Sequence, residues 1–459
     1  MTNVPTSKCR ASFRFGLSKL AVAGCLTALG ASHLWAATRC VNPAKNSGCY
    51  ASIGAAVAVA SAGDVIQVSK GTYKEDVVIT QSLSLVAADP DRVIIDATGL
   101  ANGIFVNGMS AAPAAGVSGV LISGFKIRNA NFEGILVANA ADVTIIDNEV
   151  SDNDLALDIG GGTCPGLNTS FETNEQDDCG EGVHLMATSN SSLVRNEVDH
   201  NSGGVLITDE TGPTDSNLLR DNYVHDNPYD CGITIASHGA ATGLIPSASL
   251  PYGVTRNVIS HNISAHNGYQ VPGAGAGVGI FAPFPGTTAA GNVVIGNDLR
   301  DNGLPGVAMH NHASAPSPAP AVNMNDNVVI HNRFSGNGTD TEDAATSGPT
   351  GVNVYSTAPV SGTVVAQNVF DNESIDVAFN VPSGQLNAHF NDFSKGIGVD
   401  NIGAGLVDAT ENWWHCAMGP AGINCATVSG AGVTTTPWLP SPFDQPNRGL
   451  ERFPFTRID

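Results

Sequence analysis

The chain has 459 residues, of which 14% are charged and 6% aromatic, and it carries a formal net charge of −22 at pH 7. A chain this negative repels nucleic acid and anionic membrane surfaces, so we expect neither as a partner. With 42% hydrophobic residues and 52 glycines it is too apolar for a disordered protein, and it lacks the Gly-X-Y period of collagen.

The first 36 residues have the layout of a secretory signal peptide. A basic front with Lys8, Arg10, Arg14 and Lys19 precedes an apolar stretch that ends in small residues near Ala36. Its removal takes four of 20 Lys and Arg, leaving 16 against 42 Asp and Glu and a net charge of −26. We therefore expect a secreted or periplasmic protein. No other stretch reaches the ~20 apolar residues of a transmembrane helix, so we expect no membrane span.

Seven cysteines follow that segment, and six of them form close pairs in the sequence. The pairs are Cys40 with Cys49, Cys164 with Cys179, and Cys416 with Cys425, and Cys231 is the odd one. Short loops closed by disulfides fit an oxidising compartment. Connectivity does not follow from sequence alone, but we expect these three neighbouring pairs to be disulfides.

The middle of the chain repeats a six-residue unit that begins and ends with Asn. It occurs as NEVSDN (148–153), NEVDHN (196–201), NYVHDN (222–227), NISAHN (262–267), NDLRDN (297–302) and NRFSGN (332–337). A Gly-apolar-x-apolar word follows most of these units; such words begin at Gly134, Gly182, Gly204, Gly232, Gly277, Gly306 and Gly351. Short alternating segments between Gly and Asn predict strands joined by tight turns, stacked as a solenoid around one apolar core. We expect the second Asn of each unit to lie at a turn and to hydrogen-bond its neighbours along the stack.

The segment SIGAAVAVASAGDVIQVSKGTY, which begins at Ser52, and ENWWHCAMGP, which begins at Glu411, carry a resemblance to a known family. The chain resembles the right-handed parallel β-helix proteins of the pectin-lyase-like superfamily. The resemblance implies an all-β solenoid with three strands per coil. It also implies an N-terminal helical cap at 37–63, the β-helix at 64–410 and a C-terminal capping tail at 411–459. Since this fold hosts lyases, hydrolases, esterases, epimerases, metal-protein accessory factors and adhesins, it does not fix the function.

Counting outward from each Gly predicts the candidate site. Positions +1 and +3 are apolar and should face the core, so +2, +4 and +6 should face solvent while the strand lasts. These outward positions include His184 and Thr234 at +2, Thr208, Phe281, His310 and Tyr355 at +4, and Glu210, His238 and His312 at +6. Adjacent strands lie ~4.8 Å apart, so Glu210 and His238 should be neighbours, with His312 ~10 Å further along. Inserted loops on one side of the solenoid should wall this face.

We expect this face to be a trough that holds a polysaccharide. His238, His310, His312, His184 and the pair Asp209 and Glu210 are the candidate catalytic residues, because imidazole is neutral near pH 7 and can act as a base. Phe281 and Tyr355 would offer apolar faces to sugar rings, and Thr208 and Thr234 would bind substrate.

The sequence leaves the reaction open between hydrolase, lyase and epimerase. Uronate lyases of this fold commonly use Arg or Lys as base, and the proposed ladders carry neither, which argues against a typical pectate lyase.

Two other functions compete with a carbohydrate-active enzyme. The N-terminal half also resembles the copper-binding maturation protein of nitrous-oxide reductase. That resemblance makes His238, His310, His312 and Glu210 candidate ligands for copper or zinc. The third function is a cell-surface interaction protein without catalysis. No cofactor is certain, and binding of a calcium or transition-metal ion stays open. We expect a monomer.

Overall fold

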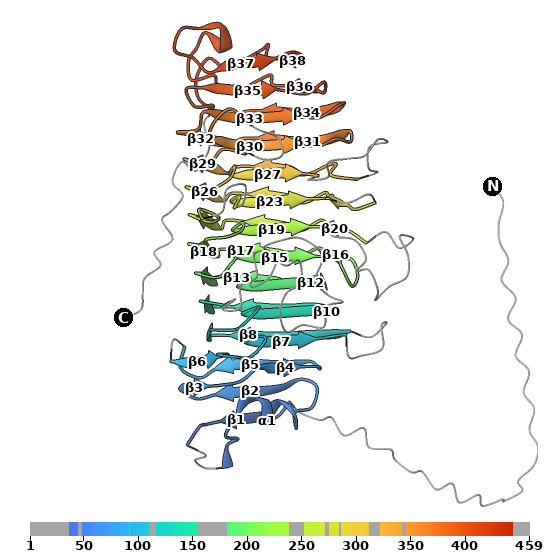
Figure 1. Cartoon of the computed structure of the whole chain (residues 1–459), viewed down its shortest axis with the longest axis vertical. Coiled ribbons are helices and arrows are strands. Elements are labelled where there is room, and N and C mark those ends of the chain that lie inside the picture. The colour runs from blue at the N-terminus through green and yellow to red at the C-terminus, as the bar shows by residue number, and fades with distance from the viewer. Residues whose placement is uncertain are drawn as a thin grey trace, which may run out of the picture. The chain divides into compact units, whose positions relative to one another are not determined.

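A computed structural model describes residues 36–44, 48–90, 92–109, 116–153, 181–237, 252–270, 275–283, 286–311, 322–341 and 346–443. All of these residues belong to one unit, in which parallel strands lie one above another from the N-terminal to the C-terminal end (Figure 1). Most coils contribute a strand to each of three faces, as the sequence predicted.

The first face carries the candidate site residues. Its strands are β4 (Val77–Ile79), β7 (Ile104–Asn107), β10 (Ile135–Ile146), β12 (Val183–Ser189), β15 (Val205–Thr208), β19 (Ile233–Ala236), β23 (Val278–Phe281), β27 (Val307–His310), β30 (Thr350–Tyr355), β33 (Ile375–Asn380), β35 (Ile397–Asn401) and β37 (Thr427–Gly430). Every pairing along it is parallel, for example β12 with β15 and β27 with β30.

The second face begins with the N-terminal strand. It consists of β1 (Thr38–Val41), β2 (Asp64–Val68), β5 (Leu83–Ala87), β8 (Val117–Ser123), the end of β10, β13 (Ser192–Val194), β17 (Leu218–Arg220), β21 (Val258–Ser260), β25 (Val293–Ile295), β28 (Val328–Ile330), β31 (Val360–Ala366), β34 (Gly384–His389), β36 (Leu406–Asp408) and β38 (Val433–Thr434). Three two-residue strands, β16 (Thr214–Asp215), β20 (Val254–Thr255) and β24 (Ala289–Ala290), lie between the first two faces. Because β10 pairs with both β12 and β13, the two faces form one continuous 28-stranded sheet.

The third face is a separate ten-stranded sheet. It contains β3 (Gly71–Tyr73), β6 (Val93–Asp96), β9 (Lys126–Arg128), β11 (Glu149–Ser151), β14 (Glu197–Asp199), β18 (Tyr223–His225), β22 (Ile263–Ala265), β26 (Asp298–Arg300), β29 (Arg333–Ser335) and β32 (Val369–Asp371). Inward side chains from all three faces, such as Val205, Leu219 and Val224, form one continuous apolar core.

Both ends of the core are closed. The short helix α1 (Ile53–Val57) buries Ile53, Ala56 and Val57 against the first coils, as the predicted cap requires. Its first turn is held by the Glu75 carboxylate, which accepts hydrogen bonds from two backbone N–H groups at 2.8 and 2.7 Å. At the other end Trp414 is fully buried against Phe393. The 3-10 helix η2 (Gly419–Ala421), β37 and β38 lie inside the segment expected to be a capping tail, so paired strands continue to Thr434.

Asparagine ladders run along the stack, as predicted for the second Asn of each unit. That ladder contains Asn153, Asn201, Asn227, Asn267, Asn302 and Asn337. The first Asn of each unit forms a second ladder, from Asn148 through Asn196, Asn222, Asn262, Asn297, Asn332, Asn368 and Asn391 to Asn412. A third ladder, which the sequence analysis did not predict, joins Asn217, Asn257, Asn292 and Asn327.

The left-handed residue of each turn is the one before the Asn. Asp221, His261 and His331 have φ of 57°, 57° and 58°. The histidines in the HN dipeptides of the repeats are therefore turn residues, and short polar side chains tolerate this conformation best.

Two of the three expected disulfides are confirmed, Cys40–Cys49 and Cys416–Cys425. Cys164 and Cys179 lie outside the described residues, as does the predicted signal segment up to residue 35. Cys231 is buried and forms no disulfide. Within the described residues, no helix has the length and hydropathy of a membrane span.

The ladders predict a large effect for one buried amide. The Asn262 side chain accepts from the backbone N–H and side-chain amide of Asn222 at 3.0 and 2.9 Å. It donates to the Leu219 carbonyl and to Asn297, both at 3.0 Å. Asn262→Ala leaves buried partners unsatisfied, so we expect its free energy of unfolding to fall by about 2–4 kcal/mol in urea denaturation.

His261→Asn is the matched control, because it changes the adjacent exposed residue to one that suits its left-handed backbone. We expect its stability to change by less than about 0.5 kcal/mol. Equal stability losses in the two variants would contradict a stabilising role for the ladder.

Candidate functional site

The outward row at position +6 is not a strand ladder. The strands β15, β19 and β27 end at Thr208, Ala236 and His310, which are the +4 positions. The prediction that Glu210 continues the same ladder is therefore wrong, because the backbone has already left the strand. His238 and His312 lie outside the described residues, so their expected neighbourhood with Glu210 stays a prediction.

The outward side chains of the first face are buried, where the sequence analysis expected them to face solvent. His184, Glu210 and His310 are 0%, 0% and 1% exposed. Phe281 is also buried, while Tyr355 is half-buried. The alternation of inward and outward residues was predicted correctly, but outward does not mean exposed on this face.

His310 lies between two aromatic rings on neighbouring strands. The register pairs Phe281 with His310 and His310 with Tyr355. The ring centroids of Phe281 and Tyr355 lie 6.0 and 6.1 Å from that of His310. This row of three rings is the part of the predicted site that the structure brings together most clearly.

A carboxylate completes the surroundings of His310. Asp340 Oδ2 lies 3.2 Å from His310 Nε2, and both side chains are 2% exposed. Asn353, on the next strand, donates its side-chain N–H to the same Asp340 oxygen at 2.9 Å. Sequence analysis missed Asp340, because it belongs to the inserted segment before β30 and not to a repeat.

Asp209 is buried and directly follows the last residue of β15. Its Oδ2 accepts a hydrogen bond from the Ser237 hydroxyl at 2.9 Å, and Ser237 Oγ accepts from the Thr288 backbone N–H at 3.0 Å. These contacts tie together the ends of neighbouring coils.

Thr234 is buried beside Cys231, whose thiol pKa is raised by burial in spite of hydrogen bonding from Ala276 and Thr234.

His184 takes part in a second imidazole–carboxylate cluster. Its Nδ1 lies 3.1 Å from Glu133 Oε1, and its Nε2 lies 2.7 Å from the Thr208 hydroxyl. Ligand atoms of Glu133, Glu181 and His184 all lie within 4.8 Å of one another, and all three residues are buried. The sequence does carry a signal for the two glutamates, since each stands directly before the Gly of its coil, as EGILV and EGVHL. The positions counted from each Gly begin after it, so they do not include these two glutamates.

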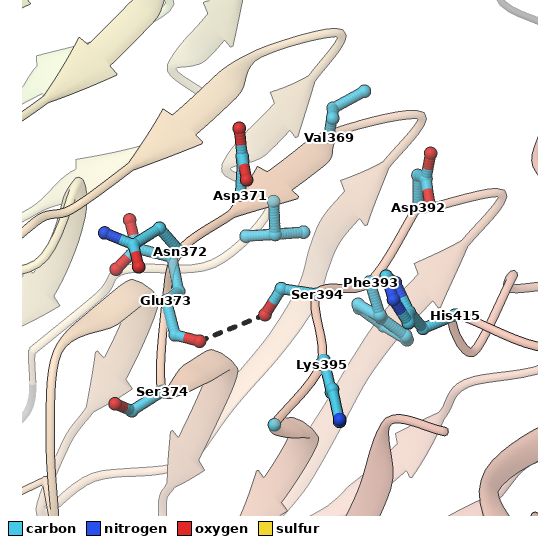
Figure 2. A pocket seen from close by; sticks show the side chains of 12 residues that line it. Val369, Asp371, Asn372, Glu373, Ser374, Asp392, Phe393, Ser394, Lys395 and His415 are labelled. Carbon is cyan, nitrogen blue, oxygen red and sulfur yellow. Dashed lines mark hydrogen bonds between the residues drawn. The ribbon is translucent and has the colours of Figure 1, made fainter. Parts of the chain in front are cut away.

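A cleft of about 730 Å³ lies near the C-terminal end, at the turns that follow β32 and precede β35. Figure 2 shows Asp371 at the end of β32, Glu373 and Ser374 on the turn after it, and Ser394 and Lys395 on the turn of the next coil. The Ser394 hydroxyl donates to the Glu373 carbonyl at 3.0 Å and to buried Asp376 at 2.6 Å. Burial raises the pKa of Asp376 well above its ordinary value.

Glu373 occupies the next position of an asparagine ladder. Its Oε1 accepts from the backbone N–H and the side-chain amide of Asn337 at 3.2 and 2.9 Å, where the coils below have Asn. The residue before it, Asn372, has the left-handed backbone (φ 61°) of every such turn. We therefore interpret Glu373 as a ladder residue and not as a catalytic acid.

Three comparisons with known proteins complete this description. A family model described as right-handed β-helix region matches residues 95–245. Together with the parallel pairing of the three faces, this match identifies the fold. The chain folds as a right-handed parallel β-helix. No curated protein matches the sequence significantly.

Solved structures similar to this β-helix protein share little of its sequence. An alginate lyase from Paenibacillus sp. is 13% identical with a TM-score of 0.46, and the alignment covers 69% of this chain and 92% of that one. The mannuronan C-5 epimerase AlgE4 A-module of Azotobacter vinelandii is 13% identical with a TM-score of 0.42, covering 70% and 90%. PfbA, a surface adhesin of Streptococcus pneumoniae, is 12% identical with a TM-score of 0.39, covering 78% and 80%. These likenesses carry no information on the chemistry of this chain.

The ladder glutamate of the β-helix predicts a pH dependence of stability. Burial raises the pKa of Glu373 from 4.5 to about 7. Between these values the folded state holds a proton that the unfolded state releases, so the free energy of unfolding falls as pH rises through this window. Glu373→Gln keeps an acceptor for Asn337 and needs no proton. We expect it to be more stable than the wild type by about 1–3 kcal/mol at pH 8, measured by urea denaturation, and closer to it at pH 5.

Asp147→Asn serves as the control, because this carboxylate is exposed, pairs with Arg195 at the surface and lies on a distant coil. We expect it to leave the pH dependence unchanged. A Glu373→Gln variant that is less stable than the wild type at pH 8 would contradict a raised pKa of the buried Glu373.

Proposed function

We propose that the protein acts on a polysaccharide at the outer side of its first face, with His310 as the proton-transfer residue. The observation that carries the proposal is the placement of His310 between Phe281 and Tyr355 with the Asp340 carboxylate 3.2 Å from its Nε2.

The imidazole–carboxylate pair supports acid–base chemistry. A carboxylate beside an imidazole fixes the orientation of the ring and stabilises its protonated form. Asp340 is itself held by the Asn353 amide at 2.9 Å, so the pair is anchored to β30. The first-face strands from β10 to β35 hold no Lys or Arg within the described residues, so histidine is the basic side chain that these strands supply.

The neighbouring rings support a carbohydrate as the substrate class. Aromatic faces pack against the apolar faces of sugar rings, and here two rings flank the imidazole along the direction in which strands stack. A polymer can extend along that direction, because each coil adds its outward side chains to the same line. Tyr355 is half-buried, so we expect substrate to approach His310 from the β30 side.

We also propose that the mature protein is exported after removal of residues 1–36. The support is the pair of disulfides in short loops, Cys40–Cys49 and Cys416–Cys425, which persist in oxidising compartments. Sequencing of the N-terminus of exported protein checks this proposal, with a start near Ala37 expected and an intact residue 1 contradicting it.

Substitution of His310 tests the proposed activity. The purified protein is screened against neutral and uronate polysaccharides for turnover and for binding. For the polysaccharide that is turned over, we expect His310→Ala to lower kcat/KM by about 100-fold or more, because a positioned acid–base residue contributes this much. Asp340→Asn should lower it less, since the imidazole remains.

His331→Asn is the matched control, because it removes an exposed turn imidazole at a left-handed position that Asn tolerates. We expect its kcat/KM to match the wild type. Full activity in folded His310→Ala would overturn the assignment of His310. Binding without turnover across the panel would favour a surface interaction protein instead.

A further inference from the structure

The buried trio of Glu133, Glu181 and His184 is independent of the residues proposed to act on a polysaccharide. It lies on the N-terminal half of the first face, where Glu133 precedes β10 and Glu181 precedes β12 (Figure 1 labels both strands). The two glutamates are stacked on successive coils, because the Gly134 N–H donates to the Glu181 carbonyl at 3.1 Å. His184 is the second residue of β12 and points outward on the same face.

The geometry of the trio is that of a compact donor set. One ligand atom from each residue lies within 4.8 Å of the other two, and His184 Nδ1 lies 3.1 Å from Glu133 Oε1. Metal–oxygen and metal–nitrogen bonds in zinc sites are about 2.0–2.2 Å, so two donors on one ion lie ~3.3 Å apart. A contraction of at most ~1.5 Å at the widest pair would therefore place all three donors on one ion.

Charge is the second reason to look for a cation here. Glu133, Glu181 and His184 are 0%, 1% and 0% exposed. Two carboxylates buried this close together repel each other unless a proton or a cation lies between them. Glu133 Oε2 is buried and has no hydrogen-bond partner among the residues that the structure describes.

We propose that Glu133, Glu181 and His184 bind a divalent first-row transition-metal ion of the Zn²⁺ or Mn²⁺ type. An imidazole with two carboxylates suits these ions, whereas Ca²⁺ takes oxygen ligands alone. In this arrangement His184 binds the ion through Nδ1 and donates its Nε2–H to the Thr208 hydroxyl, which lies 2.7 Å away. A hydrogen bond from the other ring nitrogen is the usual support of a metal-binding histidine.

Neighbouring residues also hold the backbone of Thr208 in position, and with it the residue that carries the hydroxyl. The Thr208 backbone carbonyl accepts a hydrogen bond from the Thr214 hydroxyl, and Thr214 Oγ1 accepts from the Thr188 backbone N–H at 3.1 Å. The support of His184 is thus part of the framework that joins β12, β15 and β16.

Metal titration of untagged full-length protein tests the site. The protein is stripped with a chelator and dialysed, and Zn²⁺, Mn²⁺ and Ca²⁺ are then titrated separately by calorimetry, with metal content read by mass spectrometry. We expect one equivalent of Zn²⁺ or Mn²⁺ with micromolar or tighter affinity, at least 100-fold weaker Ca²⁺ binding, and a higher melting temperature with the bound ion.

The variant Glu133→Gln/Glu181→Gln keeps the size of both side chains and removes their charge. We expect it to fold without metal and to lose at least 100-fold in Zn²⁺ affinity. Glu181→Gln alone provides the same test, with a smaller loss, should the double variant not fold. Glu373→Gln is the control for loss of a buried carboxylate elsewhere, and its affinity should match the wild type.

Two results would overturn the proposal. One is the absence of a Zn²⁺ or Mn²⁺ equivalent at 100 μM metal in folded wild-type protein. The other is equal binding by the wild type and the double variant, which would place the ion on other side chains. Neither result bears on the role of His310. The metal site and the proposed polysaccharide activity are therefore tested independently.

Discussion

The structure depends on a side-chain amide that accepts hydrogen bonds from one coil and donates them to the next. At each tight turn the chain would otherwise bury backbone N–H and C=O groups without partners, at a cost of ~1–3 kcal/mol each. Asn222 solves this at its turn, since it accepts the Asn196 backbone N–H at 2.9 Å and donates to the Leu193 carbonyl at 2.9 Å. Repeated from Asn148 to Asn412, this interaction stacks the turns of that ladder one above another.

Because the turns are fixed, the register of the strands between them is fixed as well. This register places the residues of the candidate sites next to one another. Phe281, His310 and Tyr355 come from three coils with different insertions between them, yet the strand pairing brings them side by side. Glu133 and Glu181 are 48 residues apart in the sequence and stacked for the same reason. In each case the repeat sets the positions of the strands. The candidate functional residues stand at the few positions where one coil differs from the others.

Much of this architecture could be predicted from the sequence, because its cause is local. The Asn and Gly of each repeat mark turns, and the apolar residues at +1 and +3 mark the inward side. These two patterns were enough to predict the solenoid fold and the outward row at +4. The ends of the strands could not be predicted in this way. The strands stop at +4 because the loops begin there, and this removed Glu210 from the ladder on which sequence reasoning had placed it.

The remaining differences concern residues that stand outside the repeat. Asp340 reaches His310 from an insertion, and no periodic pattern gives the path of an inserted segment. Glu133 and Glu181 stand before the Gly from which positions were counted, although the repeated EG dipeptide could have identified them. His184 and His310 are buried because other parts of the chain cover the outer side of the first face. The alternation of residues along a strand does not predict such a cover.

The central claim is that ligand binds on the outer side of the first face, at the row formed by β23, β27 and β30. Hydrogen–deuterium exchange of the wild-type protein, with and without an oligosaccharide of the polysaccharide it binds or turns over, tests this claim most directly. The account predicts slower exchange in peptides that contain Phe281, His310 and Tyr355, and unchanged exchange around Glu373 and Ser394. Protection confined to the C-terminal cleft, with no change in β27, would contradict it.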